Sequence, residues 1–335
     1  MRCLKFLPGL IFAAVFAAGQ ASAAEPVKIR LAWVVPVSNW ATMLVEKMDL
    51  ATHNGKSYTL EAVRYQGTPP MITALAAGEL EIALLAYPTV GLAIENAGMK
   101  DLRIIADETQ DGAPGHYSHE FMVRNDSPIR SVTDLKGKVL ATNASGSAVD
   151  IAMRAILRKS RIDVKKDVTV IETSFPNMKA MLGEKKVDLV PAVLPFSFDP
   201  GLRSIGRTLF TQRDAMGTNE LGFWAARAGF IQKNRAALVD LSEDTMRIIR
   251  WYLDPANHKA AVAIAAKITK QPEQNFDAWL FTDKDYYRDR NMIPNLAALQ
   301  SNLNVVHELG LIKAPITIKQ YADLSIVQEA AKRLK

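Results

Sequence analysis

The stretch TPPMITALAAGELEIALLAYP, residues 68–88, has the pattern of a helix followed by a buried strand, and the chain carries a second copy of it. That copy is FPNMKAMLGEKKVDLVPAVLP, residues 175–195. A shift of 107 positions (176 minus 69) pairs Pro69 with Pro176. The run that follows Gly78 is too apolar for a half-exposed strand. The echo predicts one helix–strand unit that is used twice.

The elements before each copy also follow one order. In both sets a strand is followed by a helix and a second strand, and then by the echoed helix and strand. Such alternation predicts an α/β fold with two helix-covered, mostly parallel sheets. The expected strands and helices are 27–33, 40–51 and 57–65 in the first set, and 137–143, 148–159 and 167–173 in the second.

The rest of the chain completes the predicted division into lobes. From Phe230 onward the apolar residues recur mainly at helical spacing, so this part is expected to cover the first lobe. A chain of 335 residues is long enough for two lobes. We predict residues 24–120 as the first part of lobe I, 121–221 as lobe II, and 222–335 as the return strand of lobe I with the C-terminal helices.

The first 23 residues have the features of a secretory signal peptide. Arg2 and Lys5 precede an apolar run, and Ala21-Ser22-Ala23 is a small-residue cleavage site. We predict an exported protein that is cleaved near Ala23. The single cysteine, Cys3, would leave with this segment, so the mature chain would have no disulfide, no thiol nucleophile and no cysteine metal site.

Composition excludes some partners. The formal net charge of +6 is mild, and the basic residues are spread along the chain rather than clustered in a stripe. A nucleic-acid partner is therefore not expected. The small surplus of positive charge is compatible with a small anionic ligand.

Two loops offer hydrogen-bond donors where parallel strands end and helices begin, which is where open α/β sheets bind ligands. Gly67 and Thr68 precede one helix, and Ser145, Gly146 and Ser147 precede another. The N–H groups and the partial positive charge of a helix start can hold an anion. The alternative for either loop alone is an ordinary helix cap: Thr68 can cap the helix that begins at Pro69, and Ser147 opens a capping box with Asp150. Asn39 is likewise a predicted cap, for the helix that begins at Trp40.

Aromatic side chains gather near the same predicted strand ends. A wall of aromatic residues with a few polar groups is typical of a small-molecule site. Core packing is the alternative and is expected for Trp33 and Phe198. Arg64, after the second strand, is either a ligand partner or a solvated arginine. The aromatic set is Trp33, Trp40, Tyr87, Tyr117, Phe196, Phe198 and Trp224.

Catalytic and metal patterns are not found. His116 and His119 stand three apart without an HExxH pattern, and the NASGSA loop lacks the lysine of a phosphate loop. No G-x-S-x-G nucleophile sequence occurs. We predict a protein without a catalytic residue, a metal site or a cofactor.

Three segments resemble one known family. SVTDLKGKVLATNASGSAVDIAMRAIL, residues 131–157, resembles the ligand-loop segment of periplasmic substrate-binding proteins for nitrate, taurine and alkanesulfonates. Residues 72–88 resemble a second family segment, with Glu81 in place of the usual Asp, and residues 307–316 resemble a third. Lys185-Lys186 departs from the glycine that many members carry. The resemblance covers nearly the whole mature chain.

The resemblance implies a type II periplasmic-binding-protein fold. Its two lobes would be joined by two crossover segments, here near Glu120–Met122 and Gly222–Trp224. A monomer would close on its ligand and deliver it to the membrane permease of an ABC importer. The implied cleft is lined by the loop 35–40, by Gln66 to Thr68, by Tyr87 and by Asn143 to Ser147.

The predicted ligand-binding set combines this cleft with the aromatic residues. Its high aromatic content favours an organic anion with an apolar body, either a sulfonate or a carboxylate, and an aromatic one in particular. The set is Asn39, Trp40, Gln66, Gly67, Thr68, Tyr87, Asn143, Ser145, Gly146, Ser147, Phe196 and Trp224.

Two other functions stay open at this point. One is an enzyme of similar fold related to the thiamine-pyrimidine synthases, although their cysteine-rich motif is absent here. The other is a periplasmic ligand sensor, which the sequence does not separate from a transport receptor.

Overall fold

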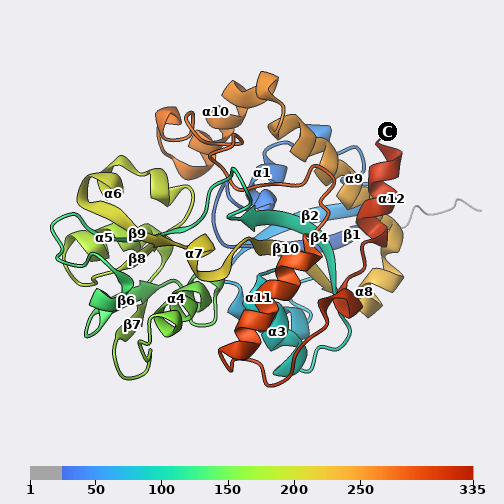
Figure 1. Ribbon diagram of the computed structural model, residues 1–335. Coiled ribbons are helices and arrows are strands. Elements are labelled where there is room, and N and C mark those ends of the chain that lie inside the picture. The colour runs from blue at the N-terminus through green and yellow to red at the C-terminus, as the bar shows by residue number, and fades with distance from the viewer. Residues whose placement is uncertain (1–24, 335) are drawn as a thin grey trace, which may run out of the picture.

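The computed structural model describes residues 25–334, which form two lobes side by side (Figure 1). The predicted signal peptide, residues 1–23, lies outside these residues. Within the described part, no helix has both the length and the apolar character needed to cross a bilayer.

The sheet of lobe I has the strand order β2-β1-β3-β10-β4. β1 pairs in parallel with β2, and a parallel bridge from Leu31 to Ile82 leads toward β3. β10 is antiparallel to both of its neighbours. The strands are β1 (Val27–Trp33), β2 (Tyr58–Arg64), β3 (Ala83–Leu85), β4 (Leu102–Asp111) and β10 (Asn219–Arg227).

The sheet of lobe II has the matching order β7-β6-β8-β5-β9, again with one antiparallel strand, β5. A parallel bridge between Leu140 and Leu189 joins its two parts. The echo in the sequence therefore marks the same unit in both lobes, and the predicted α/β fold is confirmed. The strands are β5 (Glu120–Arg124), β6 (Val139–Thr142), β7 (Thr169–Glu172), β8 (Val190–Ala192) and β9 (Gly206–Thr211).

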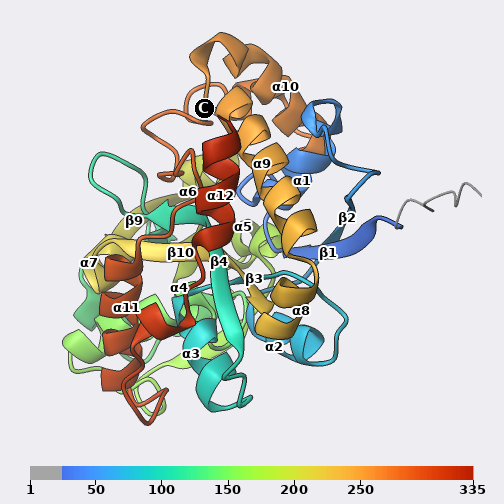
Figure 2. The same cartoon turned by 90° about the vertical axis from the view of Figure 1, so that its right-hand side faces the viewer.

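The C-terminal helices cover lobe I, as the sequence predicts, and α9 lies beside α12 (Figure 2). The helices of lobe I are α1 (Trp40–Val45), α2 (Pro69–Ala76) and α3 (Tyr87–Glu95), and those of lobe II are α4 (Ala148–Lys159), α5 (Met178–Gly183), α6 (Pro200–Ile205) and α7 (Gln212–Met216). The C-terminal set is α8 (Ala228–Lys233), α9 (Arg235–Tyr252), α10 (His258–Thr269), α11 (Leu296–Glu308) and α12 (Ser325–Arg333).

Helix starts follow the predictions in part. Ser147 caps α4, because its hydroxyl accepts a hydrogen bond from the N–H of Asp150. Thr68 and Asn39 precede α2 and α1 without a side-chain cap, and the Asn39 side chain bonds the N–H groups of Val34 and Val35 instead. α1 also ends at Val45, earlier than expected, and a short 3-10 turn follows at Met48–Leu50.

Two short segments, 112–119 and 212–218, connect the lobes. The crossovers expected near Glu120–Met122 and Gly222–Trp224 fall inside β5 and β10, where ladder hydrogen bonds hold the backbone. Asp111 holds the first connection: its Oδ1 accepts from the N–H of His119 at 2.6 Å and its Oδ2 from the Ser118 hydroxyl at 2.9 Å. The Ser118 oxygen in turn accepts from the N–H of Arg213 at 2.9 Å, which joins the two connections. The exact lobe boundaries stay a prediction.

Residues 270–294 form an irregular segment that the sequence did not predict. It buries Phe276, Trp279 and Tyr286. The ring of Trp279 stacks on Phe198 of lobe II with centroids 5.5 Å apart. The segment therefore runs from the C-terminal helices onto the second lobe.

Candidate functional site

Two adjoining cavities that share part of their lining lie between the lobes. The inner cavity has a volume of about 90 Å³ and the outer groove about 900 Å³. Val34, Val35 and Phe175 line both. Together they form a cleft at the carboxyl ends of the parallel strands, where α/β sheets bind ligands.

The inner cavity is mainly apolar, and both lobes contribute to it. Its polar groups are neutral hydroxyls, amides and one histidine, and among residues 25–334 no lysine or arginine lines it. The apolar lining is Val34, Val35, Leu84, Ala86, Ala148, Val149, Phe175, Val193, Leu194 and Leu221, and the polar lining is Ser38, Asn39, Thr68, Thr109, His119, Asn143, Ser147 and Tyr286, with Gly67 and Gly222 between them.

Thr68 has the one cavity hydroxyl that is buried without a hydrogen-bond partner in the described chain. The Ser38 hydroxyl, by comparison, donates to the carbonyl of Leu194 at 2.7 Å. A buried hydroxyl without a partner costs free energy. Thr68 is therefore the polar group most ready to bind a ligand.

His119 contributes no positive charge to the inner cavity. Burial lowers the pKa of its imidazole, so the ring is neutral at pH 7. Its Nδ1 lies 3.2 Å from Gln212 Oε1, and its Nε2 lies 2.7 Å from the Tyr286 hydroxyl. His119 is thus a fixed polar wall rather than a cation.

The loop expected to donate hydrogen bonds to an anion already donates to the protein's own carboxylates. The N–H of Ser145 binds Glu172 Oε1 at 2.8 Å, and the N–H of Gly146 binds Asp150 Oδ2 at 2.8 Å. The Ser147 hydroxyl donates to Asn143 Oδ1 at 2.7 Å. These donors are therefore occupied before any ligand arrives.

The outer groove has aromatic walls and one unpaired cation. Phe175 and Phe196 of lobe II stack with centroids 6.4 Å apart. Opposite them in the lining, the guanidinium of Arg64 lies 5.6 Å from the ring of Trp33. Within residues 25–334, Arg64 makes no ion pair or side-chain hydrogen bond, whereas Lys267 in the same groove pairs with Glu46 at 2.5 Å.

The structure brings seven of the twelve predicted ligand residues into the cleft. Asn39, Gly67, Thr68, Asn143 and Ser147 line the inner cavity, and Gln66 and Phe196 line the outer groove. Trp40, Tyr87, Ser145, Gly146 and Trp224 line neither cavity.

Trp40 and Trp224 belong to the core of lobe I, where both are buried. Glu108 joins them: its Oε1 accepts from the backbone N–H of Trp40 at 2.9 Å and its Oε2 from the indole N–H of Trp224 at 2.5 Å. Burial raises the pKa of this carboxyl to about 7. The two indoles are thus fixed by an internal acid, away from the cleft.

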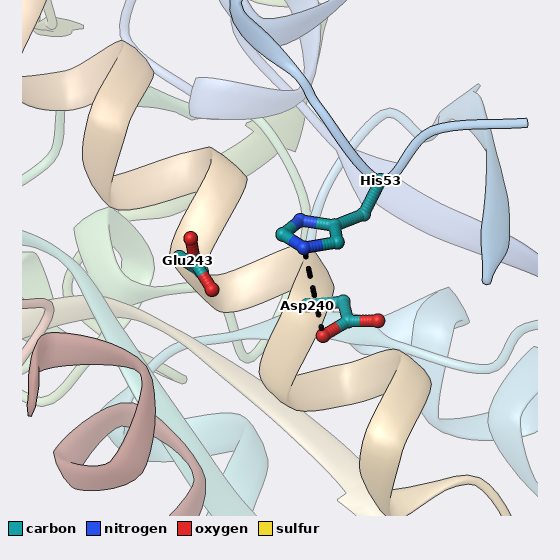
Figure 3. A group of neighbouring side chains, drawn as sticks. All are labelled: His53, Asp240 and Glu243. Carbon is teal, nitrogen blue, oxygen red and sulfur yellow. Dashed lines mark ion pairs between the residues drawn. The ribbon is translucent and has the colours of Figure 1, made fainter. Parts of the chain in front are cut away.

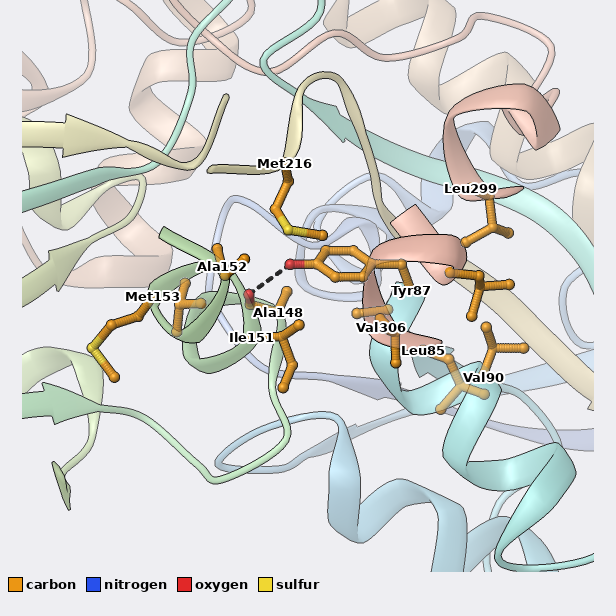
Figure 4. Packing of buried hydrophobic residues seen from close by; sticks show 14 of the residues in the cluster. Leu85, Tyr87, Val90, Ala148, Ile151, Ala152, Met153, Met216, Leu299 and Val306 are labelled. Atoms are coloured by element: carbon orange, nitrogen blue, oxygen red, sulfur yellow. Dashed lines mark hydrogen bonds between the residues drawn. The ribbon is translucent and has the colours of Figure 1, made fainter. Parts of the chain in front are cut away.

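Tyr87 binds lobe I to lobe II directly. Its hydroxyl donates to the carbonyl of Ala148 at 2.7 Å, and its ring is fully buried (Figure 4). The same cluster holds Met216 and Leu299, so it takes side chains from both lobes and from α11. Tyr87 therefore acts in the contact between the lobes.

Further hydrogen bonds join the two walls of the cleft. The side-chain amide of Gln66 donates to the backbone carbonyl of Asn143 at 3.0 Å, and the side-chain amide of Asn143 donates to the backbone carbonyl of Gln66 at 3.2 Å. Ser38 reaches Leu194 from the opposite wall. The structure is thus a closed form in which the lobes touch around a small inner cavity.

A group of His53, Asp240 and Glu243 lies on lobe I, outside both cavities (Figure 3). Its carboxylates already bind arginines: Arg333 lies 2.8 Å from Asp240, and Arg247 lies 2.6 Å from Glu243. This group is therefore neutralised by side chains and does not require a metal.

Sequence reasoning missed several residues that line the inner cavity, among them Ser38, Thr109, His119 and Tyr286. Ser38 lies in the loop 35–40 that the resemblance implied. His119 was considered only as a metal ligand. Tyr286 lies in the irregular segment, and its only signal is an aromatic residue without helical or strand periodicity.

Solved structures share this fold over nearly the whole chain. They include the alkanesulfonate-binding protein SsuA from Xanthomonas axonopodis pv. citri bound to MOPS (TM-score 0.70, 17% identity, 90% of this chain and 100% of that chain). They also include the periplasmic nitrate-binding protein NrtA from Synechocystis PCC 6803 (0.71, 14%, 93% and 90%). The desulfurization enzyme DSZB matches too (0.64, 16%, 92% and 100%). At these identities the likeness establishes the fold.

The two lobes with matching sheets have the fold of periplasmic binding proteins, as the sequence resemblance predicted. The sequence model of the NMT1-like family matches residues 22–266, and the chain belongs to that family. No curated protein sequence matches the chain.

Proposed function

We propose that the chain is an extracytoplasmic solute-binding protein. It captures a small organic anion, a sulfonate or carboxylate with an apolar and preferably aromatic body, and delivers it to the membrane permease of an ABC importer. It acts as a periplasmic monomer after cleavage near Ala23, without chemical conversion of the ligand. The observation that carries the proposal is the pair of adjoining cavities between two lobes of matching topology.

The first test is direct binding. The protein is purified from its own periplasm, and native mass spectrometry identifies a co-purified small molecule. Calorimetry with sulfonates, carboxylates and nitrate then measures affinity, which we expect to be micromolar or tighter, roughly 8 kcal/mol. If none of these anions binds and the co-purified molecule is not an anion, the proposal that the ligand is an anion is contradicted.

The second test separates transport from the alternatives. Cells that lack the protein should lose uptake of the identified ligand, and the purified protein should return that ligand unchanged. Formation of a product on incubation would instead support an enzyme. Normal uptake combined with a lost transcriptional response would support a sensor.

A further inference from the structure

We propose that the ligand binds tail first: its short apolar end occupies the inner cavity, and its single negative charge lies in the outer groove at Arg64. Arg64 is then a specificity-determining residue. This inference rests on the proposed function, because it names the polarity and orientation of the molecule that the cleft holds.

The first step is the lack of charge compensation in the inner cavity. Its polar side chains are neutral, and the lowered pKa of His119 keeps that ring uncharged. An anion moved from water to such a place without a counter-charge is strongly disfavoured.

The second step concerns helix starts, which can bind anions without a charged side chain. α2 begins with Pro69 and Pro70, which have no N–H to offer. Before α4, the N–H groups of Ser145 and Gly146 are held by Glu172 and Asp150. α1 and α3 also begin at the inner cavity, where Asn39 and Ala86 precede them. There the N–H of Trp40 is held by Glu108 and the N–H of Ala86 by the Thr89 hydroxyl. The helix starts at the cleft are thus poor in free donors and, at α1 and α4, already next to carboxylates.

The third step concerns the charges behind the cavity wall. Asp111 accepts from the backbone of His119, and Asp285 is also buried. The buried Arg288 donates to the carbonyl of Ser38 at 3.1 Å, stacks 4.7 Å from the ring of Trp40, and lies 3.6 Å from Asp285. Arg288 lines neither cavity, and its positive charge is paired with Asp285, although its Nε and Nη2 have no hydrogen-bond partner in the described chain. No positively charged side chain therefore reaches the surface of the inner cavity.

The fourth step is size. The inner volume of about 90 Å³ is smaller than the roughly 150 Å³ of an engineered cavity that binds benzene in another protein. It therefore suits a group of a few carbons, with the Thr68 hydroxyl available for one polar atom. The rest of the ligand must lie in the outer groove, between the stacked Phe175 and Phe196 and the Trp33 side.

The fifth step is the position of Arg64. It ends β2 directly beside Trp33, which ends β1, so both stand at the ligand-binding edge of the sheet. Its guanidinium is exposed and unpaired in the described chain. A guanidinium can bind a carboxylate or sulfonate through parallel hydrogen bonds.

The test is calorimetry on the full mature chain with methanesulfonate, butanesulfonate, benzenesulfonate and the matching butane disulfonate. We expect affinity to rise with the apolar tail and to be lost when the tail carries a second charge. Arg64→Gln should weaken butanesulfonate binding by about tenfold and flatten its salt dependence. The matched control is Lys28→Gln, which removes the same charge at the other end of β1, where Lys28 pairs with Glu61; it should change affinity less than about twofold.

The outcomes separate the two proposals. If the disulfonate binds as well as the monosulfonate, or if Arg64→Gln binds like the control, the tail-first orientation is overturned while a solute-binding role remains. If no anion binds to the correctly folded wild type, with circular dichroism as the check, the proposed ligand class fails as well.

Discussion

Thr68 is a single side chain whose hydrogen-bonding capacity is unmet beside an apolar cavity. Thr89, on the next helix, also has a buried hydroxyl, but that hydroxyl bonds both the N–H and the carbonyl of Ala86. The same residue type thus has an unmet hydroxyl at one position and a satisfied hydroxyl at the other.

Thr68→Val should therefore separate binding from stability. Removing a hydroxyl without a partner should leave the free energy of unfolding within about 0.5 kcal/mol of wild type, whereas ligand affinity should fall about three- to tenfold. Thr89→Val should cost about 1–2 kcal/mol and leave affinity near wild type. Urea unfolding and calorimetry measure the two effects, and a large loss of stability in Thr68→Val would contradict this account.

Glu108 predicts a pH dependence of stability. Its pKa is raised to about 7 in the folded protein from an ordinary value of 4.5. The folded state therefore binds this proton more tightly than the unfolded state, so the contribution is fully present below pH 4.5 and is lost as the pH rises to about 7.

Glu108→Gln should remove this part of the change in the free energy of unfolding between pH 4.5 and about 7, because the amide does not titrate. That part is at most about 3 kcal/mol. Urea unfolding at a series of pH values between these limits measures it. The exposed Glu184→Gln is the control and should keep the wild-type slope. Parallel profiles for wild type and Glu108→Gln would rule out this role.

At the scale of elements, the irregular segment 270–294 is the part of the fold that the sequence predicted least well. Its Tyr286 hydroxyl accepts from the N–H of Leu194 at 3.1 Å and lies 2.7 Å from His119 Nε2. One side chain thus ties the C-terminal part of the chain to both a crossover and lobe II.

Tyr286→Phe should destabilise the protein by about 1–3 kcal/mol, since two buried groups lose their partner. The neighbouring Tyr287→Phe is the control, because that ring is 36% exposed, and it should change stability by less than about 0.5 kcal/mol. Thermal and urea unfolding measure both, and equal effects would show that the hydroxyl of Tyr286 is unimportant.

The regular elements could be predicted because their signals are local. Apolar periodicity identified the strands of both lobes and the helices α2, α4 and α5, but not α3, α6 or α7, and the Ser147 cap gave the start of α4 correctly. The place of β10 between β3 and β4, and the packing of segment 270–294, depend on contacts between distant residues, which periodicity does not record. For the same reason the sequence assigned both Thr68 and Trp40 to the ligand, whereas only Thr68 lines the cleft, since a buried indole and a cleft indole have the same local pattern.

At the scale of the whole molecule, the lobes touch each other directly. Tyr87, Gln66 and Ser38 on one side bond Ala148, Asn143 and Leu194 on the other. With these contacts made, the inner cavity has a volume of only about 90 Å³ and is lined by both lobes, so a larger group can enter it only when the lobes separate. Each contact therefore biases the equilibrium between the closed and open forms.

Tyr87→Phe should shift this equilibrium toward the open form. The ring stays and keeps its packing, while the hydrogen bond to Ala148 is lost. We expect a larger radius of gyration by small-angle X-ray scattering without ligand, and about fivefold weaker ligand binding through faster dissociation. Unchanged scattering together with unchanged affinity would contradict a role in closure.

The strand orders also determine when each lobe can be completed during synthesis. The sheet of lobe II uses β5 to β9, which are continuous in the chain, so all its strands are available once Thr211 has emerged. Lobe I lacks β10 until later, and β3 and β4 then keep unpaired apolar edges facing the gap that β10 fills. The lobe begun first is finished last, and a chain that stops before Asn219 would display the open edges of a buried sheet, which is the kind of surface that aggregates or is recognised by chaperones.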